Sequence, residues 1–181
     1  MPKDGRWYEL IKGELIKMTP PGGLHDEIPL RQGRYLQTHV EIDELGKVMV
    51  DSGFLLAFQP DIVRGLDISF VATNRFPPDG LPERFFSATP DLAMEIVSPE
   101  DTDIEVQDKV MDYLTHGTRQ VWVVRPRQGT VPVYRPDGGL PMCCGRQMFW
   151  TERMYCPASP CRFGSCSDSF IIDDVFFITA S

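Results

Sequence analysis

Residues 90–124, PDLAMEIVSPEDTDIEVQDKVMDYLTHGTRQVWVV, predict a strand, a helix and a second strand in succession. The first strand, Leu92–Val97, is apolar except for Glu95, which is typical of a central strand with buried neighbours. Burial of an unpaired carboxylate costs several kcal/mol, so a lone acid in such a strand needs a charged partner or a metal ion. Glu95 is therefore the first candidate functional residue.

The helix in this stretch is expected to begin at Thr102 or Asp103 and to end at His116, just before Gly117. Its apolar side is formed by Val106, Val110, Tyr113 and Leu114. Lys109 lies on the same helix, where a lysine is either a solvated side chain or a functional cation.

Two short runs near the start of the chain, Trp7–Ile11 and Glu14–Met18, predict a hairpin, because Lys12 and Gly13 can form a tight turn between them. A helix is expected from about residue 24 to residue 45. Pro29 is early enough in this segment to be tolerated in a first helical turn.

Further strands are expected at residues 48–50, 54–58, 66–71, 120–124 and 131–134. A turn at residues 51–53 is expected to separate the first two, and Asp67 is expected at the beginning of the third. The order of hairpin, helix, strands, helix and hairpin predicts one α/β or α+β domain, in which helices flank a mixed central sheet.

The composition restricts the classes of function. A chain of 181 residues with 42% hydrophobic residues can bury one core. Because 26 acidic residues outnumber 18 basic ones, the chain is not a general polyanion binder, and a nucleic-acid role would require a local basic strip or metal ions. The sequence has neither a signal-peptide pattern nor a long apolar run, so a cytoplasmic protein without a membrane partner is expected.

Asp67, Glu95 and Lys109 form the candidate site. Two carboxylates on adjacent strands can hold Mg²⁺ or Mn²⁺, and a nearby lysine can orient or deprotonate water and offset charge on a phosphate. Simpler interpretations exist: Asp67 as a strand cap, an arginine as the partner of Glu95, and Lys109 as a solvated residue. Glu14 and His25 are outlying candidates, with an exposed hairpin acid and a surface or capping histidine as the alternatives.

Several segments resemble the Uma-type family of restriction endonucleases, a branch of the PD-(D/E)XK nuclease superfamily. They are YELIKGELIKMTPPGGLH, LDISFV, PDLAMEIVSPEDT, EVQDKVMDYLTHGTRQVWVV and VYRPDGG, within residues 6–140. The resemblance implies a restriction-endonuclease-like core, cleavage of DNA with Mg²⁺ or Mn²⁺, and assembly as a homodimer.

The resemblance also implies the ligands of the metal ion. The first acid of the family corresponds to Asp67, and the glutamate of its E-x-V-S-P segment corresponds to Glu95; the carbonyl of Ile96 would be a third ligand. The family usually has proline before the first acid, whereas this chain has Leu66. That difference keeps the ligand but can alter the backbone angle that presents it.

The remaining functional residues follow from the same resemblance. The superfamily lysine normally lies two residues after the glutamate, where this chain has Val97, and the family instead has a lysine on the following helix, which corresponds to Lys109. Glu14 corresponds to a helix-side acid, and His25 to a contact with phosphate or water.

The end of the chain departs from this pattern. All five cysteines lie between Cys143 and Cys166, and residues from about 141 onward do not match the family. Codons chosen for residues 147–170 and read in a shifted frame can spell ADVLDGEDVLPGFPLPVRELF, a family-like ending, followed by a stop. We therefore expect a nuclease-like domain at 1–140 and a frameshifted tail at 141–181, with a zinc site or disulfides as the alternative.

Two functions from different classes follow. The first is a metal-dependent endodeoxyribonuclease. The second is a noncatalytic nucleic-acid-binding or interaction module on a nuclease scaffold, which the acidic balance and the altered tail favour. A damaged gene product with an intact site is a third possibility.

Overall fold

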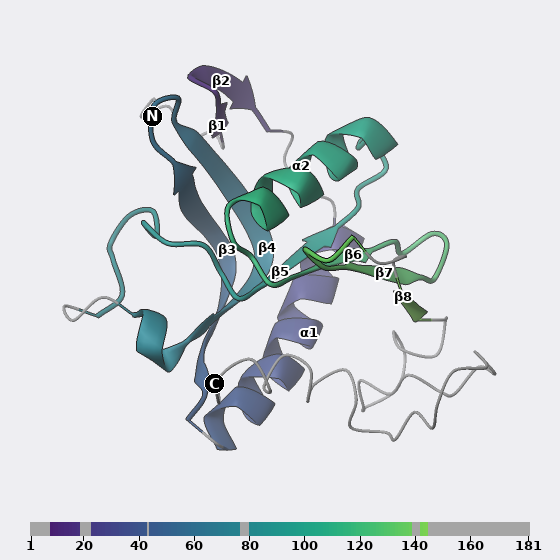
Figure 1. Cartoon of the computed structure of the whole chain (residues 1–181). Helices are drawn as coiled ribbons and strands as arrows, with labels where there is room; N and C mark the ends of the chain where they lie inside the picture. The colour runs from purple at the N-terminus through teal and green to yellow at the C-terminus, as the bar shows by residue number, and fades with distance from the viewer. Residues whose placement is uncertain (1–7, 19–22, 43, 77–79, 139–141, 145–181) are drawn as a thin grey trace.

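A computed structural model describes residues 8–18, 23–42, 44–76, 80–138 and 142–144 (Figure 1). Within these residues the strands form one eight-stranded mixed sheet in the order β2-β1-β4-β5-β6-β7-β8, with β3 paired to β4. The elements are β1 Tyr8–Ile11, β2 Glu14–Lys17, α1 Gly23–Ile42, β3 Gly46–Ala57, β4 Ile62–Ala72, a 3-10 turn at Thr73–Arg75, β5 Leu92–Ile96, α2 Asp103–Thr115, β6 Gln120–Val124, β7 Val131–Tyr134 and β8 Met142–Cys144. The pair β5–β6 is parallel, whereas the other named strand pairs are antiparallel.

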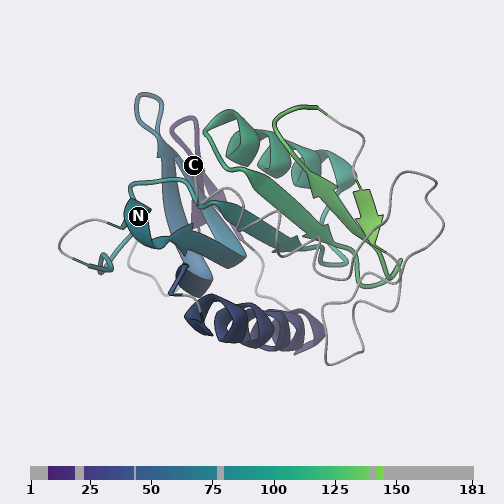
Figure 2. The ribbon, with the colours of Figure 1, turned by 60° about the horizontal axis from the view of Figure 1, so that its bottom comes forward.

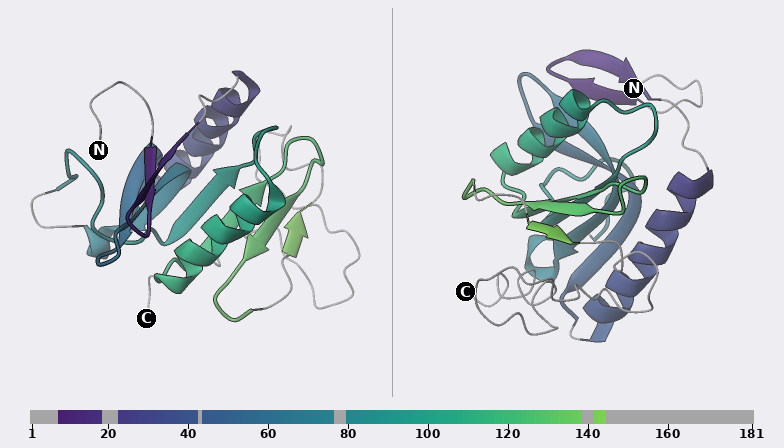
Figure 3. Two further views of the ribbon diagram at one scale, coloured as in Figure 1. Left: turned by 90° about the horizontal axis from the view of Figure 1, so that it is seen from above. Right: turned by 90° about the vertical axis from the view of Figure 1, so that its right-hand side faces the viewer.

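The two helices cover opposite faces of the sheet (Figures 2 and 3). Residues alternate along β5, so successive side chains enter different cores. The core under α1 includes Leu36, Val40, Ile68, Phe70, Leu92, Met94, Ile96 and Trp122. The core under α2 includes Val106, Val110, Tyr113, Leu66, Ala93, Val121 and Val123. The predicted fold class, a mixed sheet flanked by helices, is confirmed.

Local signals predicted α2 well. Thr102 is the N-cap, and its hydroxyl accepts a hydrogen bond from the Glu105 amide, while the Glu105 carboxylate accepts one from the Thr102 amide. Such a reciprocal capping box satisfies two amides that the first helical turn leaves free. At the other end His116 is the C-cap, and Gly117 has φ +100°, a conformation that favours glycine.

The predicted break between two short strands at residues 51–53 is wrong. β3 runs through these residues as one strand, because it pairs with β4 over nearly its whole length. Gly53 is explained by packing rather than by a turn, since a side chain there would collide with the ring of Phe85. β4 is also longer than expected, so Asp67 lies in its middle rather than at its beginning.

The first helix also differs from its prediction. α1 begins at Gly23 and ends at Ile42, so Pro29 is its seventh residue and lies beyond the first turn. Pro29 is buried, and the helix continues past it although its nitrogen cannot donate a hydrogen bond. Packing of α1 on the sheet therefore outweighs one missing backbone bond.

β8 lies within the segment expected to be aberrant. Its residues pair with β7, Val131 opposite Cys144 and Val133 opposite Met142. The remainder of the expected tail, residue 141 and residues 145–181, lies outside the described residues, as do its other three cysteines. Over the part of the chain that the structure describes, neither helix has the length and hydrophobicity needed to cross a membrane.

Candidate active site

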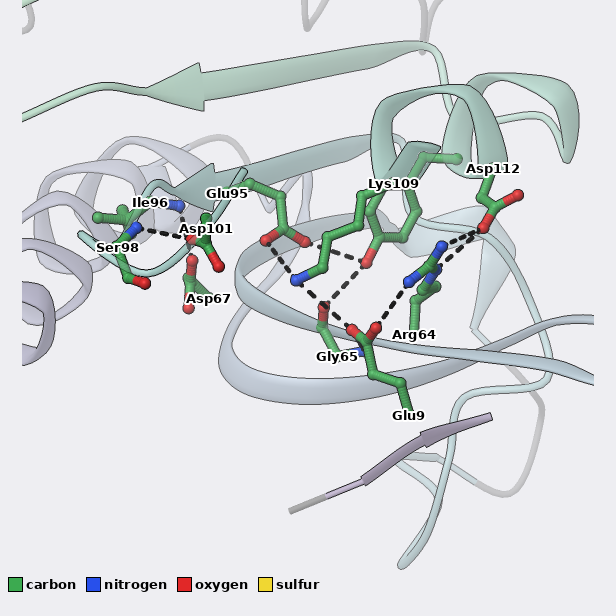
Figure 4. Close-up of polar contacts among 11 residues, drawn as sticks. Glu9, Arg64, Gly65, Asp67, Glu95, Ile96, Ser98, Asp101, Lys109 and Asp112 are labelled. Atoms are coloured by element: carbon green, nitrogen blue, oxygen red, sulfur yellow. Dashed lines mark hydrogen bonds and ion pairs between the residues drawn. The ribbon is translucent and has the colours of Figure 1, made fainter. Parts of the chain in front are cut away.

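Asp67 and Glu95 come from the adjacent strands β4 and β5. The last paired residues of this ladder are Ile68 and Met94, and the same register continued by one residue sets Asp67 opposite Glu95. Beyond this pair, the Ile96 amide donates a hydrogen bond of 2.6 Å to Oδ2 of the Asp67 side chain (Figure 4). A side-chain oxygen therefore accepts the bond that a backbone carbonyl would accept in a continued ladder. The sheet pairing therefore ends where the two acids meet.

Glu95 points toward α2, and two side chains of that helix hold its carboxylate. Lys109 Nζ lies 3.2 Å from Oε2. The Tyr113 hydroxyl lies 3.2 Å from Oε1 and 2.9 Å from the Gly65 carbonyl oxygen, two acceptors that share its single hydrogen. Glu95 is 7% exposed, so both contacts are largely shielded from water.

The electrostatics show a site that is short of positive charge. Burial raises the pKa of Glu95 to about 8, and the charges of Asp67 and Glu9 act in the same direction, against Lys109. Burial likewise raises the pKa of Asp67 to about 6, although the Ile96 amide and Lys109 oppose it. One lysine therefore does not offset the carboxylates around it.

Glu9 is a site residue that the sequence reasoning missed. It lies on β1, is 2% exposed, and its Oε1 is 3.5 Å from Lys109 Nζ and 3.1 Å from the Gly65 amide nitrogen. Its Oε2 accepts a hydrogen bond of 2.7 Å from Arg64. The signal was present in Tyr8–Ile11, where Glu9 is a single acid in an otherwise uncharged strand, the same pattern that identified Glu95.

The model of the family described as "Uma2: Putative restriction endonuclease" matches residues 1–143. The chain belongs to the Uma2 family. No curated protein matches the chain significantly. Membership of Uma2 supports a nuclease.

A solved structure shares the fold of this Uma2 chain. It is the crystal structure of a putative nuclease belonging to DUF820 from Anabaena variabilis ATCC 29413. The two proteins are 24% identical, the match covers 80% of each chain, and the TM-score is 0.71. At this identity the likeness shows a common fold.

The structure brings together some of the predicted residues of this Uma2 protein and not others. Asp67, Glu95 and Lys109 converge, and Lys109 is an ion-pairing, partly buried residue rather than a solvated one. Glu14 is exposed on β2, and no described contact joins it to these three residues. His25 belongs to α1, which covers the opposite face of the sheet from α2, and its side chain lies outside the described residues.

The donor atoms of this Uma2 site fit a hard cation. The carboxylates of Asp67 and Glu95 supply oxygen ligands, and Ile96 follows Glu95 at the end of β5. Within the described residues no group of three or more His, Cys, Asp or Glu side chains is arranged to hold a metal ion. Two carboxylates beside a backbone carbonyl are a donor set that suits an ion which keeps several waters, as Mg²⁺ does. A small pocket adjoins it, lined by Glu95, Ile96, Val97, Asp101, Glu105, Val106 and Lys109.

Proposed function

We propose that this Uma2-family protein is a metal-dependent endodeoxyribonuclease that hydrolyses phosphodiester bonds in DNA, with Mg²⁺ or Mn²⁺ as its cofactor. The observation that carries the proposal is that Asp67, Glu95 and Lys109 come from three separate elements and converge at one buried site. In this site the carboxylates outnumber the lysine. This set of residue types corresponds to the PD-(D/E)XK nucleases, with the lysine supplied by α2 instead of by the strand of Glu95.

In this proposal the carboxylates of Asp67 and Glu95 and the carbonyl of Ile96 hold the cation. When bound, the cation supplies Lewis acidity toward a phosphate oxygen and lowers the pKa of a coordinated water. Tyr113 holds Glu95 in place through its hydroxyl. In the reaction, a water oxygen would attack phosphorus as the water gives up a proton to solvent, the P–O bond to the leaving oxygen would break, and that oxygen would take up a proton from solvent, so that one water is added across the bond.

The role of Lys109 follows from its surroundings. Burial lowers the pKa of Lys109, but the charges of Glu95, Glu9 and Asp67 outweigh burial and raise the pKa above its ordinary value. Lys109 therefore remains protonated near neutral pH. Of the two roles expected from the sequence, the ammonium group is suited to orienting water and offsetting phosphate charge, and not to removing a proton.

Cleavage of supercoiled plasmid and of single-stranded DNA with added Mg²⁺ or Mn²⁺ tests the proposal. We expect nicked and linear products that require the cation and disappear with a chelator. Absence of products from both substrates, with folded protein and either cation, would contradict it.

The second candidate is the noncatalytic module, and the excess of 26 acidic over 18 basic residues favours it as an interaction module, because this excess weakens binding to DNA phosphates. Calorimetric titration with Mn²⁺ separates the two. A nuclease site binds Mn²⁺ and loses that affinity in Glu95→Ala, whereas a scaffold has no such site to lose.

Assembly as a homodimer is part of the proposal, because two copies related by a twofold axis can cut both strands of a duplex. Light scattering of the purified protein in solution measures the mass directly. A monomer at the concentration at which DNA is cut would remove this part of the proposal and leave the site unaffected.

The two acids should make binding of the cation strongly pH-dependent. With no cation, the raised pKa of Glu95 means that the folded state loses stability as pH rises from the ordinary carboxyl range through about 8, since deprotonation then becomes unfavourable in the fold. Mn²⁺ competes with these protons, so it should raise the thermal unfolding midpoint more at about pH 8.5 than at about pH 5.5. An equal shift at both pH values, measured by calorimetry, would show that buried carboxylates do not bind the ion.

We propose that the domain spans residues 1–140 and that the tail from about 141 is frameshifted. Replacing residues from 147 onward with ADVLDGEDVLPGFPLPVRELF should stabilise the protein by about 1 kcal/mol or more, which is about 2–4 °C in unfolding midpoint for a chain of this size. A chain ending at residue 144 serves as the control. Identical midpoints for all three chains, or gene codons that cannot encode the repaired ending, would contradict the proposal.

A further inference from the structure

Lys109 reaches the site from a helix, and its position depends on its partners. The residue two places after Glu95 is Val97, so no lysine comes from the strand itself. A lysine side chain has several rotatable bonds and loses conformational entropy when it is held in one place. Two carboxylates contact it: Glu95 Oε2 at 3.2 Å and Glu9 Oε1 at 3.5 Å from Nζ.

These two carboxylates are not equivalent. Figure 4 shows Lys109 Nζ between Glu9 and Glu95, with Asp67 on the side of Glu95. Glu95 and Asp67 are the proposed ligands of the cation. A carboxylate that binds a divalent ion attracts an ammonium group less strongly, because the ion offsets its charge. Glu9 lies on the other side of Nζ and is not among the proposed ligands of the cation, so the cation does not offset its attraction for Lys109.

Glu9 is itself held rigidly. Its Oε1 accepts a hydrogen bond from the Gly65 amide, and its Oε2 accepts one from Arg64. Arg64 in turn donates to Asp112 Oδ2 through Nε at 2.9 Å and through a terminal nitrogen at 2.6 Å. Asp112 lies on α2, so Arg64 bridges the hairpin and this helix through its two carboxylate partners, Glu9 and Asp112.

We propose that Glu9 is the positioning residue for Lys109: it retains the ammonium group beside the reacting phosphate while Glu95 and Asp67 hold the cation. This inference rests on the proposed function. It assigns to the β1–β2 hairpin a part in catalysis that does not involve contact with the cation.

Glu9 also has a structural role, which the test must separate. The hairpin joins the rest of the sheet through the pairing of Leu10 with Val63 and the bond from the Gly13 amide to the Asp61 carbonyl, in addition to the bonds of Glu9. Removal of the whole side chain would loosen the hairpin. Glu9→Gln keeps the size of the side chain, and Asp112→Asn is its matched control, because each removes one carboxylate from Arg64 but only Glu9 contacts Lys109.

The first readout is the kinetics of cleavage together with the affinity for Mn²⁺. Glu9→Gln should lower kcat about 10- to 100-fold with KM and Mn²⁺ affinity within about threefold, whereas Asp112→Asn should change kcat less than about threefold. In a Lys109→Met background, Glu9→Gln should have no further effect on kcat. Equal losses of kcat in Glu9→Gln and Asp112→Asn, or an unchanged effect of Glu9→Gln without Lys109, would overturn the inference.

The second readout does not depend on activity. Labelling of the Lys109 amine with acetic anhydride, quantified by mass spectrometry in the absence and presence of Mn²⁺, reports how firmly the ammonium group is held. Glu9→Gln should speed labelling about fivefold or more, and Asp112→Asn should not. Equal labelling of Glu9→Gln and the unmodified protein would overturn the inference even if the protein cuts DNA. Faster labelling in a protein that cuts no DNA would contradict the proposed function and support the contact between Glu9 and Lys109.

Discussion

Glu95→Ala is expected to reduce DNA cleavage by about 10³-fold or more, a loss of about 4 kcal/mol of transition-state stabilisation. Glu95 is the proposed ligand of the cation and also the partner of Lys109, so its loss affects both groups that would act on the phosphate. Plasmid nicking under single-turnover conditions, together with calorimetric titration of Mn²⁺, measures both effects. The affinity for Mn²⁺ should fall in parallel with the rate.

The free energy of unfolding of this variant should change little, so that lost cleavage is distinguished from lost folding. The raised pKa of Glu95 shows that its ionised form is unfavourable in the metal-free fold near neutral pH. Removal of this carboxylate relieves that cost but also removes its hydrogen bonds with Lys109 and Tyr113, so we expect the metal-free Glu95→Ala protein to unfold within about 4 °C of the unmodified protein. Glu83→Ala, at an exposed position, is the control for loss of a carboxylate. Full cleavage by Glu95→Ala would refute the proposed site.

The second large effect is expected for Lys109→Met, which should lower cleavage about 10²- to 10⁴-fold. Methionine approximates the length of the lysine stem but carries no charge to orient water or to offset charge on the phosphate. The affinity for Mn²⁺ should stay the same or rise, because Lys109 competes with the cation for Glu95. Loss of rate with retained metal affinity therefore distinguishes Lys109 from the metal ligands.

Lys47→Met is the matched control for this substitution, since Lys47 is exposed on β3. The metal-free Lys109→Met protein should also be less stable than the control at about pH 8.5, because Glu95 and Glu9 then lose the ammonium group that both of them contact. If Lys109→Met cuts DNA as fast as Lys47→Met, the ammonium group has no part in the reaction.

Short-range patterns predicted much of the fold. Short apolar runs located β5, β6 and β7, and the cap at Thr102 with Gly117 located α2 within one or two residues. These elements depend on signals between residues close in the sequence, such as a capping hydroxyl or a glycine with positive φ. Glu95 is also marked by a local signal, because its neighbours in the strand are apolar.

The errors arose where pairing between strands outweighs local preference. Asp51, Ser52 and Gly53 predict a turn, but the long ladder between β3 and β4 carries the strand through them. The same ladder begins β4 at Ile62, which sets Asp67 in the strand interior. The local preference of three residues for a turn is small compared with the summed energy of many cross-strand contacts. The sequence pattern therefore could not locate these strand boundaries.

The sequence by itself determined the strand and helix order, the lone acid Glu95 in an apolar strand, and the presence of Lys109 on the following helix. Only the tertiary structure decided which charges meet: Lys109 with both Glu95 and Glu9, Arg64 with Glu9 and Asp112, and not Glu14. The physical reason is that ion pairs in a buried site join strands and helices far apart in the chain, and the energy of a charge depends on the neighbours that folding brings to it.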